Sequence, residues 1–164
     1  MHQPMDPDYW LREHGPKLLA FACQWVDCRA EAEDVFQEAF VRFWQSRDSV
    51  REPLLYLYRC VRNAAVDRAR SAQRRQRHER AAPPPAGTPL PEAPLDQRER
   101  ERKINGAVAK LPPRQREVVA LHLWSDMTFE QIGKILSLPR STAHALYGSA
   151  MQRLRQELQE ELRP

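Results

Sequence analysis

Residues 81–94, AAPPPAGTPLPEAP, constrain the fold of this chain more than any other segment, because they hold six of its 14 prolines and almost no charge. Proline has no amide proton to donate and fixes its own φ angle, so such a run cannot form a helix interior or a central strand. Helical periodicity returns on both sides of it. We therefore predict two domains, at 1–80 and 98–164, joined by a proline-rich linker over 81–97.

The composition favours helices and a polyanionic partner. Only 5 glycines occur among 164 residues, and the chain is rich in Ala, Leu, Glu, Gln and Arg, which form helices readily. We expect an all-α fold of two small helical domains. The formal net charge is +4, and arginine outnumbers lysine 22 to 4. Because the planar guanidinium grips phosphate and guanine better than an ammonium does, this choice of cation favours a nucleic-acid partner.

Several other classes of protein find no support in the sequence. No apolar run approaches the roughly 20 residues needed to cross a bilayer, and the first residues lack the layout of a signal peptide. The cysteines, Cys23, Cys28 and Cys60, form an odd set without CxxC spacing, so we expect buried small hydrophobes and neither metal nor cofactor. No catalytic triad, carboxylate pair or phosphate-binding loop is recognisable. We expect a cytoplasmic protein that is not an enzyme.

Two helices of the first half carry opposite charges. Between 31 and 44, apolar residues recur at spacings of three and four, typical of an amphipathic helix whose other face is acidic. A helix that begins at Pro53 has its own apolar seam and a large excess of arginine. Cations beside aromatic and amide side chains suit strand phosphates and stacked bases, although a solvated surface without a partner is the alternative for both faces. The residues concerned are Tyr56, Tyr58, Asn63, Arg59, Arg62, Arg68, Arg70, Arg74, Arg75, Arg77 and Arg80.

The second half ends in the pattern of a helix-turn-helix. Residues 128–131, Thr-Phe-Glu-Gln, are a capping box that opens a short helix, and a long helix capped near Ser141 follows Pro139. In such a motif the second helix lies in the major groove with its N-terminal side chains on base edges. An ordinary helical hairpin is the alternative.

Two groups of segments resemble a known family. AEDVFQEAFVRFW, followed by YLYRCVRNAAVDRAR, resembles the polymerase-clamp and promoter-melting segments of extracytoplasmic-function (ECF) sigma factors of the sigma-70 family. LPPRQREVVALHLWSDMTFEQIGKILSLPRSTA, followed by AMQRLRQEL, resembles their terminal helix-turn-helix domain. The resemblance covers 9–75 and 98–160 in the family's order. It implies a protein that binds core RNA polymerase and directs promoter-specific initiation.

For the first domain, the resemblance implies that the acidic helix docks on the clamp helices of the polymerase's largest subunit. The side chains assigned to this contact are Asp34, Gln37, Glu38 and Phe40. A pocket at Asn63 would take a flipped base of the non-template −10 strand, with Val50 of the loop 46–53 at its border. The residues that would hold the backbone of that strand are Arg59, Arg62 and Arg70.

For the second domain, the resemblance implies that the start of the last helix reads the −35 element, with help from an arginine of an earlier helix. These residues are Arg140, Ser141, Thr142, His144 and Arg114. The helix that carries Val118 and Leu121 would help to seat the flap tip of the polymerase. The family also implies an anti-sigma factor as a partner, beside core RNA polymerase and promoter DNA, and no membrane insertion.

The last helix departs from the family pattern, because no Lys or Arg occurs between Arg140 and Arg153 where typical members carry several. Each phosphate contact that is lost lowers the affinity and its salt dependence. Two alternatives to a working sigma factor therefore stay open. One is a sigma-like regulator that binds polymerase or an anti-sigma partner with reduced −35 reading. The other is a stand-alone helix-turn-helix regulator, which leaves the acidic and arginine-rich helices unexplained.

Overall fold

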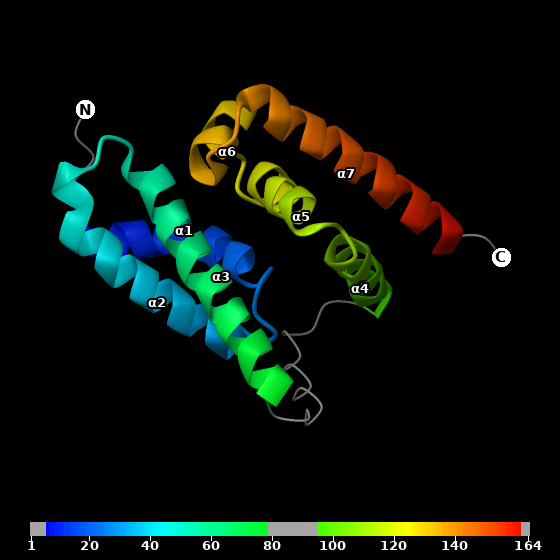
Figure 1. The fold of residues 1–164 in the computed structure, drawn as a ribbon, viewed down its shortest axis with the longest axis horizontal. Helices are drawn as coiled ribbons and strands as arrows, with labels where there is room; N and C mark the ends of the chain where they lie inside the picture. Colours follow the sequence, from blue (N-terminus) through cyan, green and yellow to red (C-terminus); the bar gives the residue numbers. More distant parts are fainter. Residues whose placement is uncertain (1–5, 79–94, 162–164) are drawn as a thin grey trace. The chain divides into compact units, whose positions relative to one another are not determined.

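The computed structural model describes residues 6–78 and 95–161, which belong to two compact units (Figure 1). All regular structure in these ranges is helical. The first unit contains α1 (Pro7–Ala22), α2 (Arg29–Ser46), the short 3₁₀ turn η1 (Arg47–Ser49) and α3 (Pro53–His78). The second contains α4 (Leu95–Ala109), α5 (Pro113–Val119), the π-helix η2 (Ala120–Trp124), α6 (Phe129–Leu136) and α7 (Arg140–Glu161). The predicted all-α fold of two helical domains, the second with a helix-turn-helix, is confirmed.

Most of the predicted linker, 81–94, lies outside the described residues, as does Arg80. The prediction also extended the linker to residue 97, whereas α4 begins at Leu95. The reason is that Pro94 is the last proline of the run, and the charged residues that follow it form helix readily.

The core of the first unit forms where α2 and α3 lie side by side and α1 packs against both (Figure 1). The positions of α2 that periodicity predicts to be apolar and inward are buried, and α3 supplies a matching seam. These core residues are Ala32, Val35, Phe36, Ala39, Phe43, Leu57, Tyr58, Val61 and Ala65. From α1, the ring of Phe21 lies 5.5 Å from Tyr58, and that of Trp10 lies 5.2 Å from Phe43. The packing leaves the polar faces of α2 and α3 outward.

Helix α1 ends at Ala22, although the apolar residues Trp25 and Val26 follow it in the sequence. The Cys23 N–H closes the helix on Leu19 O at 3.0 Å, and a turn follows. Val26 is buried beyond this turn, so its apolar character reflects packing and not helix. The prediction that the cysteines are buried is also wrong, because Cys23 is exposed and the other two are partly exposed.

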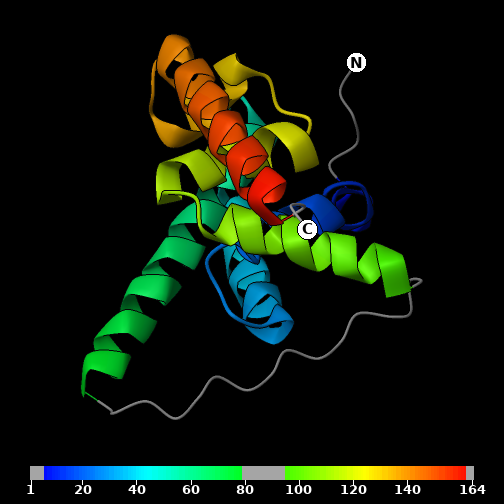
Figure 2. The same cartoon turned by 90° about the vertical axis from the view of Figure 1, so that its right-hand side faces the viewer.

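Helix α3 extends past the core of its unit. Its last buried residue is Ala65, yet the helix continues to His78, about 20 Å further at 1.5 Å per residue. Figure 2 shows these final turns projecting beyond α1 and α2. Every residue over 73–77 is exposed, so this end of the helix contributes surface and no core.

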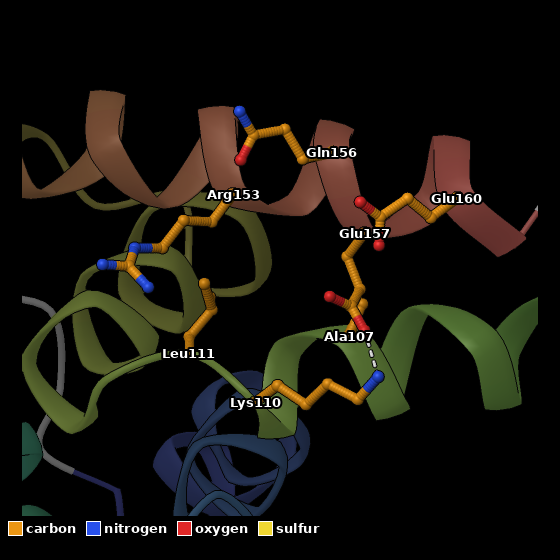
Figure 3. Close-up of a pocket in the computed structure, with 7 residues that line it drawn as sticks. All are labelled: Ala107, Lys110, Leu111, Arg153, Gln156, Glu157 and Glu160. Atoms are coloured by element: carbon orange, nitrogen blue, oxygen red, sulfur yellow. Dashed lines mark hydrogen bonds and ion pairs between the residues drawn. The ribbon is translucent and has the colours of Figure 1, made fainter.

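In the second unit, α4, α5 and α6 pack along the long helix α7. One buried cluster joins α4, α5 and α7, and Trp124 lies partly buried against it. Its buried members are Ala107, Val108, Leu111, Val119, Ala150 and Leu154. At the edge of this cluster the ammonium of Lys110, in the turn directly after α4, is ion-paired with Glu157 on α7, as Figure 3 shows. The pair ties the two helices together where the apolar contact ends.

The turn between α6 and α7 has little room. The predicted capping box is confirmed: the Gln131 N–H donates to Thr128 Oγ1 at 3.2 Å, and the Thr128 N–H donates to Gln131 Oε1 at 2.9 Å. At the other end of α6, Ser137 is left-handed with a φ of 57°, and the Leu138 N–H donates to Gly133 O at 2.8 Å. A side chain on Gly133 would place its Cβ 2.5 Å from Leu138 O, so only glycine fits there.

Helix α7 starts at Arg140, so the cap predicted near Ser141 lies two residues earlier. The Ala143 N–H donates to Pro139 O at 3.1 Å, which makes Pro139 the capping residue. Ser141 therefore lies inside the first turn, where its hydroxyl is exposed.

Candidate polymerase and DNA interfaces

The acidic face of α2 is exposed along one side of the helix. Asp34, Gln37 and Glu38 lie on successive turns and all three are exposed. The Glu38 carboxylate is paired with Arg42 at 2.7 Å, a contact that is exposed on both sides. Val41 continues the same face with 56% of its surface exposed, which is unusual for a large apolar residue in this unit. The face thus combines carboxylates with one accessible aliphatic side chain.

Phe40 does not belong to this polar face. Its ring is half-buried and lies 5.7 Å from Trp44, with Phe36 and Phe43 at 5.8 and 5.9 Å. Phe40 therefore lies apart from Asp34, Gln37 and Glu38, with which it was predicted to form the polymerase contact. Its role in the fold is to join the aromatic core at the margin of the acidic face.

The exposed face of α3 brings together most of the residues assigned to the −10 strand. Arg59, Asn63 and Arg70 are spaced by four and seven residues, so they lie on one side of the helix, and all are exposed. Arg62 is half-buried to one side of them and takes part in an interaction within the structure. The opposite side of the helix includes Val61 in the core, which fixes the orientation of this face.

The loop before α3 is an ordered turn. The Arg47 guanidinium lies 4.3 Å over the ring of Trp44 and donates to the carbonyl of the same residue. The Ser49 hydroxyl donates to Ser46 O at 2.8 Å, and the Val50 N–H donates to Arg47 O at 3.3 Å. Val50, which the sequence predicts at the border of the base pocket, is half-buried at the end of this turn.

The two tyrosines near the start of α3 differ from the prediction. Tyr58 is only 1% exposed and packs against Phe21, so it cannot stack on a base. Tyr56 is half-buried, with its ring 6.4 Å from Phe43. Burial raises the pKa of the neighbouring Cys60 thiol, and a hydrogen bond from Tyr56 partly offsets this effect. The thiol therefore stays protonated at neutral pH.

The projecting end of α3 continues the arginine-rich surface. Arg70, Gln73, Arg74 and Arg77 line one shallow pocket on it. Among the described side chains of the first unit, none forms an ion pair with these three arginines. Arg70 and Arg74 are four residues apart, where like charges repel. An external polyanion would relieve this repulsion.

The start of α7 carries the residues assigned to the −35 element. Arg140, Ser141, Thr142 and His144 are all exposed in the first turns, and Ala143 between them is fully buried. On α5, Arg114 is half exposed and lies 3.3 Å from the buried carboxylate of Glu117. The first turns of α7 thus present hydroxyls and an imidazole, whereas typical members of the family carry several lysines and arginines at these positions.

The predicted flap-tip seat needs correction. Val118 and Leu121 both have no exposed surface, because they face the interior of the second unit. Helix α5 also passes into the π-helix η2 at Ala120, and within it Leu123 is 47% exposed. Leu123 is thus the accessible apolar side chain of this segment.

Other features escaped prediction from the sequence. Val41 could have been found, because it continues the four-residue spacing from Gln37. The pairing of Arg47 with Trp44 had no recognisable signal. A cluster of four rings at the helix-turn-helix, from η2, α6 and α7, also had none, because its members are far apart in the chain. They are His122, Phe129, His144 and Tyr147.

Both units match models of one protein family. Residues 10–75 match sigma-70 region 2, and residues 107–156 match sigma-70 region 4. The chain is 30% identical to the RNA polymerase sigma factor CarQ of Myxococcus xanthus, over 90% of this chain and 86% of CarQ. It is 29% identical to the ECF RNA polymerase sigma factor SigW of Bacillus subtilis, over 79% of this chain and 76% of SigW.

Solved structures share the fold. The sigma factor RpoE of Bartonella quintana, in complex with the anti-sigma factor NepR, superposes with a TM-score of 0.76 at 23% identity over 93% of this chain and 96% of that one. CnrH, in complex with the cytosolic domain of CnrY, superposes with a TM-score of 0.70 at 20% identity, over 94% of this chain and 88% of CnrH.

The chain belongs to the extracytoplasmic-function sigma factors of the sigma-70 family. It is thus a polymerase-binding sigma factor, as the resemblance predicts. The match to region 2 over 10–75 disfavours a stand-alone helix-turn-helix regulator, in which this half would have an unrelated role. Among the described helices, none is long and apolar enough to span a membrane.

Proposed function

We propose that this chain docks on the clamp helices of core RNA polymerase through α2 and holds the separated non-template −10 strand on α3. The observation that carries the proposal is the outward face of α3, where Asn63 is exposed between Arg59 and Arg70. Taking a base out of the stack costs a few kcal/mol. An amide that hydrogen-bonds to the base, with cations on the adjoining phosphates, can offset this cost.

The clamp contact is supported by the charge and exposure of α2. Asp34, Gln37 and Glu38 present carboxylate and amide oxygens on one face, beside the exposed aliphatic side chain of Val41. A basic helical partner surface complements such a face in charge and in shape. The half-buried Phe40 would act there by supporting the helix through its ring contacts.

Run-off transcription with purified core polymerase tests the function. We expect Asn63→Ala to impair open-complex formation more than binding to core polymerase, because the amide acts only on the melted strand. Asn105→Ala, an exposed asparagine of α4, is the matched control and should change neither step. Equal loss of both steps in Asn63→Ala would argue against the pocket.

A second candidate function rests on α7. Its exposed N-terminal face carries hydroxyls and an imidazole but no lysine or arginine after Arg140 until Arg153. This composition favours a sigma-like regulator with reduced −35 reading. Co-elution with core polymerase without initiation on any promoter would select this alternative, whereas initiation on a promoter that has a −35 element would exclude it.

We further propose that an anti-sigma factor controls this chain. The proposal is supported by the fold it shares with RpoE bound to NepR and with CnrH bound to CnrY. The protein would act in the cytoplasm, where it meets polymerase and DNA, and without catalytic activity of its own.

A further inference from the structure

Helix α7, the second helix of the helix-turn-helix, has few cationic side chains with which to bind a polyanion such as DNA. Between Arg140 and Arg153, the exposed side chains of α7 are small or neutral apart from His144. These exposed neighbours are Ser141, Thr142, Ala145, Gly148, Ser149 and Gln152. His144 is therefore the one exposed side chain of these turns that can become positive near neutral pH.

The imidazole of His144 is held by other rings. It lies perpendicular to Phe129 at the start of α6, with ring centroids 5.0 Å apart and an interplanar angle of 85°. On its other side, Phe129 stacks on His122 at 4.5 Å and 19°. The Nδ1–H of His122 donates to Met127 O at 2.8 Å, so the ring of His122, on which Phe129 stacks, is held by a hydrogen bond to the backbone. Tyr147 closes the cluster, 4.7 Å from His122 and 5.4 Å from Phe129.

This arrangement orients His144 without burying it. A perpendicular ring pair is a favoured aromatic geometry, and it restricts the rotation of a side chain that would otherwise sample several rotamers. An aromatic ring also attracts an adjacent cation, so the charged imidazolium is compatible with Phe129 as a neighbour. Because His144 remains exposed, its outward edge is available to a phosphate or to a base.

Among the described residues of the elements that meet here, no acidic side chain forms an ion pair with His144. On α7, Arg140 lies one turn before it, and Tyr147 follows in the ring cluster. On α6, Glu130 and Lys134 lie within 3.9 Å of each other and form their own ion pair. The imidazole of His122, in η2, and Asp126, in the loop that precedes α6, also belong to this region, and Asp126 has an interaction of its own. Helix α5, which packs against α7 as well, carries Arg114, Arg116 and Glu117, and Arg114 is paired with Glu117.

We infer that His144, as imidazolium, is the protonation-linked DNA contact of α7, and that Phe129, braced by His122, is the residue that positions it. This inference rests on the proposed function, in which α7 faces promoter DNA. When DNA binds, the phosphates favour the charged ring, so binding takes up a proton. By reciprocity, DNA affinity rises as pH falls through the titration range of the imidazole.

A purely structural cluster is the competing explanation, in which the four rings only fix the angle between α6 and α7. Both explanations expect that removal of Phe129 weakens DNA binding. Only the proposed contact makes binding depend on pH through His144, and only it makes the titration of that ring depend on DNA.

The test uses the full chain and a fluorescein-labelled 30-bp duplex of mixed sequence, because phosphate contacts require no particular promoter. NMR follows the His144 ring from pH 5 to 8.5 with and without the duplex. We expect its titration midpoint to rise by about one pH unit with DNA, which corresponds to about tenfold tighter binding of the protonated form. In anisotropy titrations, the slope of log K against log salt should steepen by about 0.9 at low pH.

Variants separate the roles. His144→Gln should lose the extra affinity at low pH, whereas His14→Gln, in the first unit, should keep it. Phe129→Leu should reduce the pH effect and Phe129→Tyr should restore it, with circular dichroism confirming that each variant is folded. An unchanged midpoint of His144 with DNA, or an equal pH dependence in His144→Gln and the parent protein, would overturn the inference. Co-elution with core polymerase is measured separately, so failure of the proposed function would be recognised as such.

Discussion

Replacement of Gly133 by alanine tests whether the turn between α6 and α7 is as tight as the structure describes. The new Cβ would lie 2.5 Å from Leu138 O and 3.5 Å from Arg140 N, and both of these atoms are backbone. The first separation is 0.5 Å below 3.0 Å, the distance under which Cβ contacts essentially do not occur, so the turn must move. The Leu138 N–H donates to Gly133 O from the same turn, and this hydrogen bond resists the movement.

The net change in the free energy of unfolding combines one stabilising and two destabilising contributions. Alanine stabilises a helix interior by about 1 kcal/mol over glycine. Overpacking against backbone costs about 1–3 kcal/mol, and weakening of the turn's hydrogen bond adds about 1 kcal/mol. We expect Gly133→Ala to lower the free energy of unfolding of the second unit by about 2 kcal/mol. For a unit of this size, the melting temperature should fall by about 10 °C.

Two glycines of the same unit serve as matched controls. Gly106 and Gly148 also lie within helices, but a Cβ at either position meets nothing within 4 Å. Their alanine variants should therefore be more stable than the parent by about 0.5–1 kcal/mol. Thermal unfolding followed by circular dichroism measures all three. If Gly133→Ala melts as high as Gly106→Ala, the close approach of α6 to the turn is not as described.

Three further predictions concern stability. Ser137→Gly should raise the free energy of unfolding by about 1 kcal/mol, because Ser137 has a φ of 57°, and a urea titration that shows no gain would contradict this. Thr128→Ala should lower it by about 1 kcal/mol through loss of the reciprocal cap with Gln131, and Thr128→Ser should retain the cap in the same titration. Burial lowers the pKa of the His14 imidazole below its usual 6.5. As the pH falls below 6.5, the unfolded chain is therefore protonated at His14 before the folded chain is, and the free energy of unfolding decreases. Urea titrations at pH 7.5 and 5.5 should show a smaller loss in His14→Gln than in the parent, and equal losses would count against the burial.

The sequence was sufficient for those parts of the fold that depend on local chemistry. The spacing of Val35, Phe36 and Ala39 predicts the buried side of α2, because one helical face must enter the core. The cap at Thr128 follows from a four-residue pattern. The end of α1 was not predictable in this way, because Val26 is buried by a turn and an apolar pattern does not distinguish a turn from a helix.

The candidate site was predicted where exposure follows from helical register. Asn63, Arg59 and Arg70 share a face because their spacing matches the helix repeat. The failures were residues whose burial is decided by distant partners. Tyr58 lies against Phe21, and Val118 lies inside the second unit, neither of which can be read from neighbours in the sequence. The contact of His144 with Phe129 has the same character, since it depends on how α7 packs against α6.

The distribution of tryptophan gives the two units different optical signals. Trp10, Trp25 and Trp44 lie in the first unit, and Trp124, half-buried against the core of the second, is the remaining tryptophan of the four in the sequence. Indole emission depends on how far the ring is shielded from water. With the first three tryptophans replaced by phenylalanine, fluorescence would report only on the helix-turn-helix unit. Domain-by-domain unfolding, and engagement of one unit by a partner, could then be followed without an attached dye.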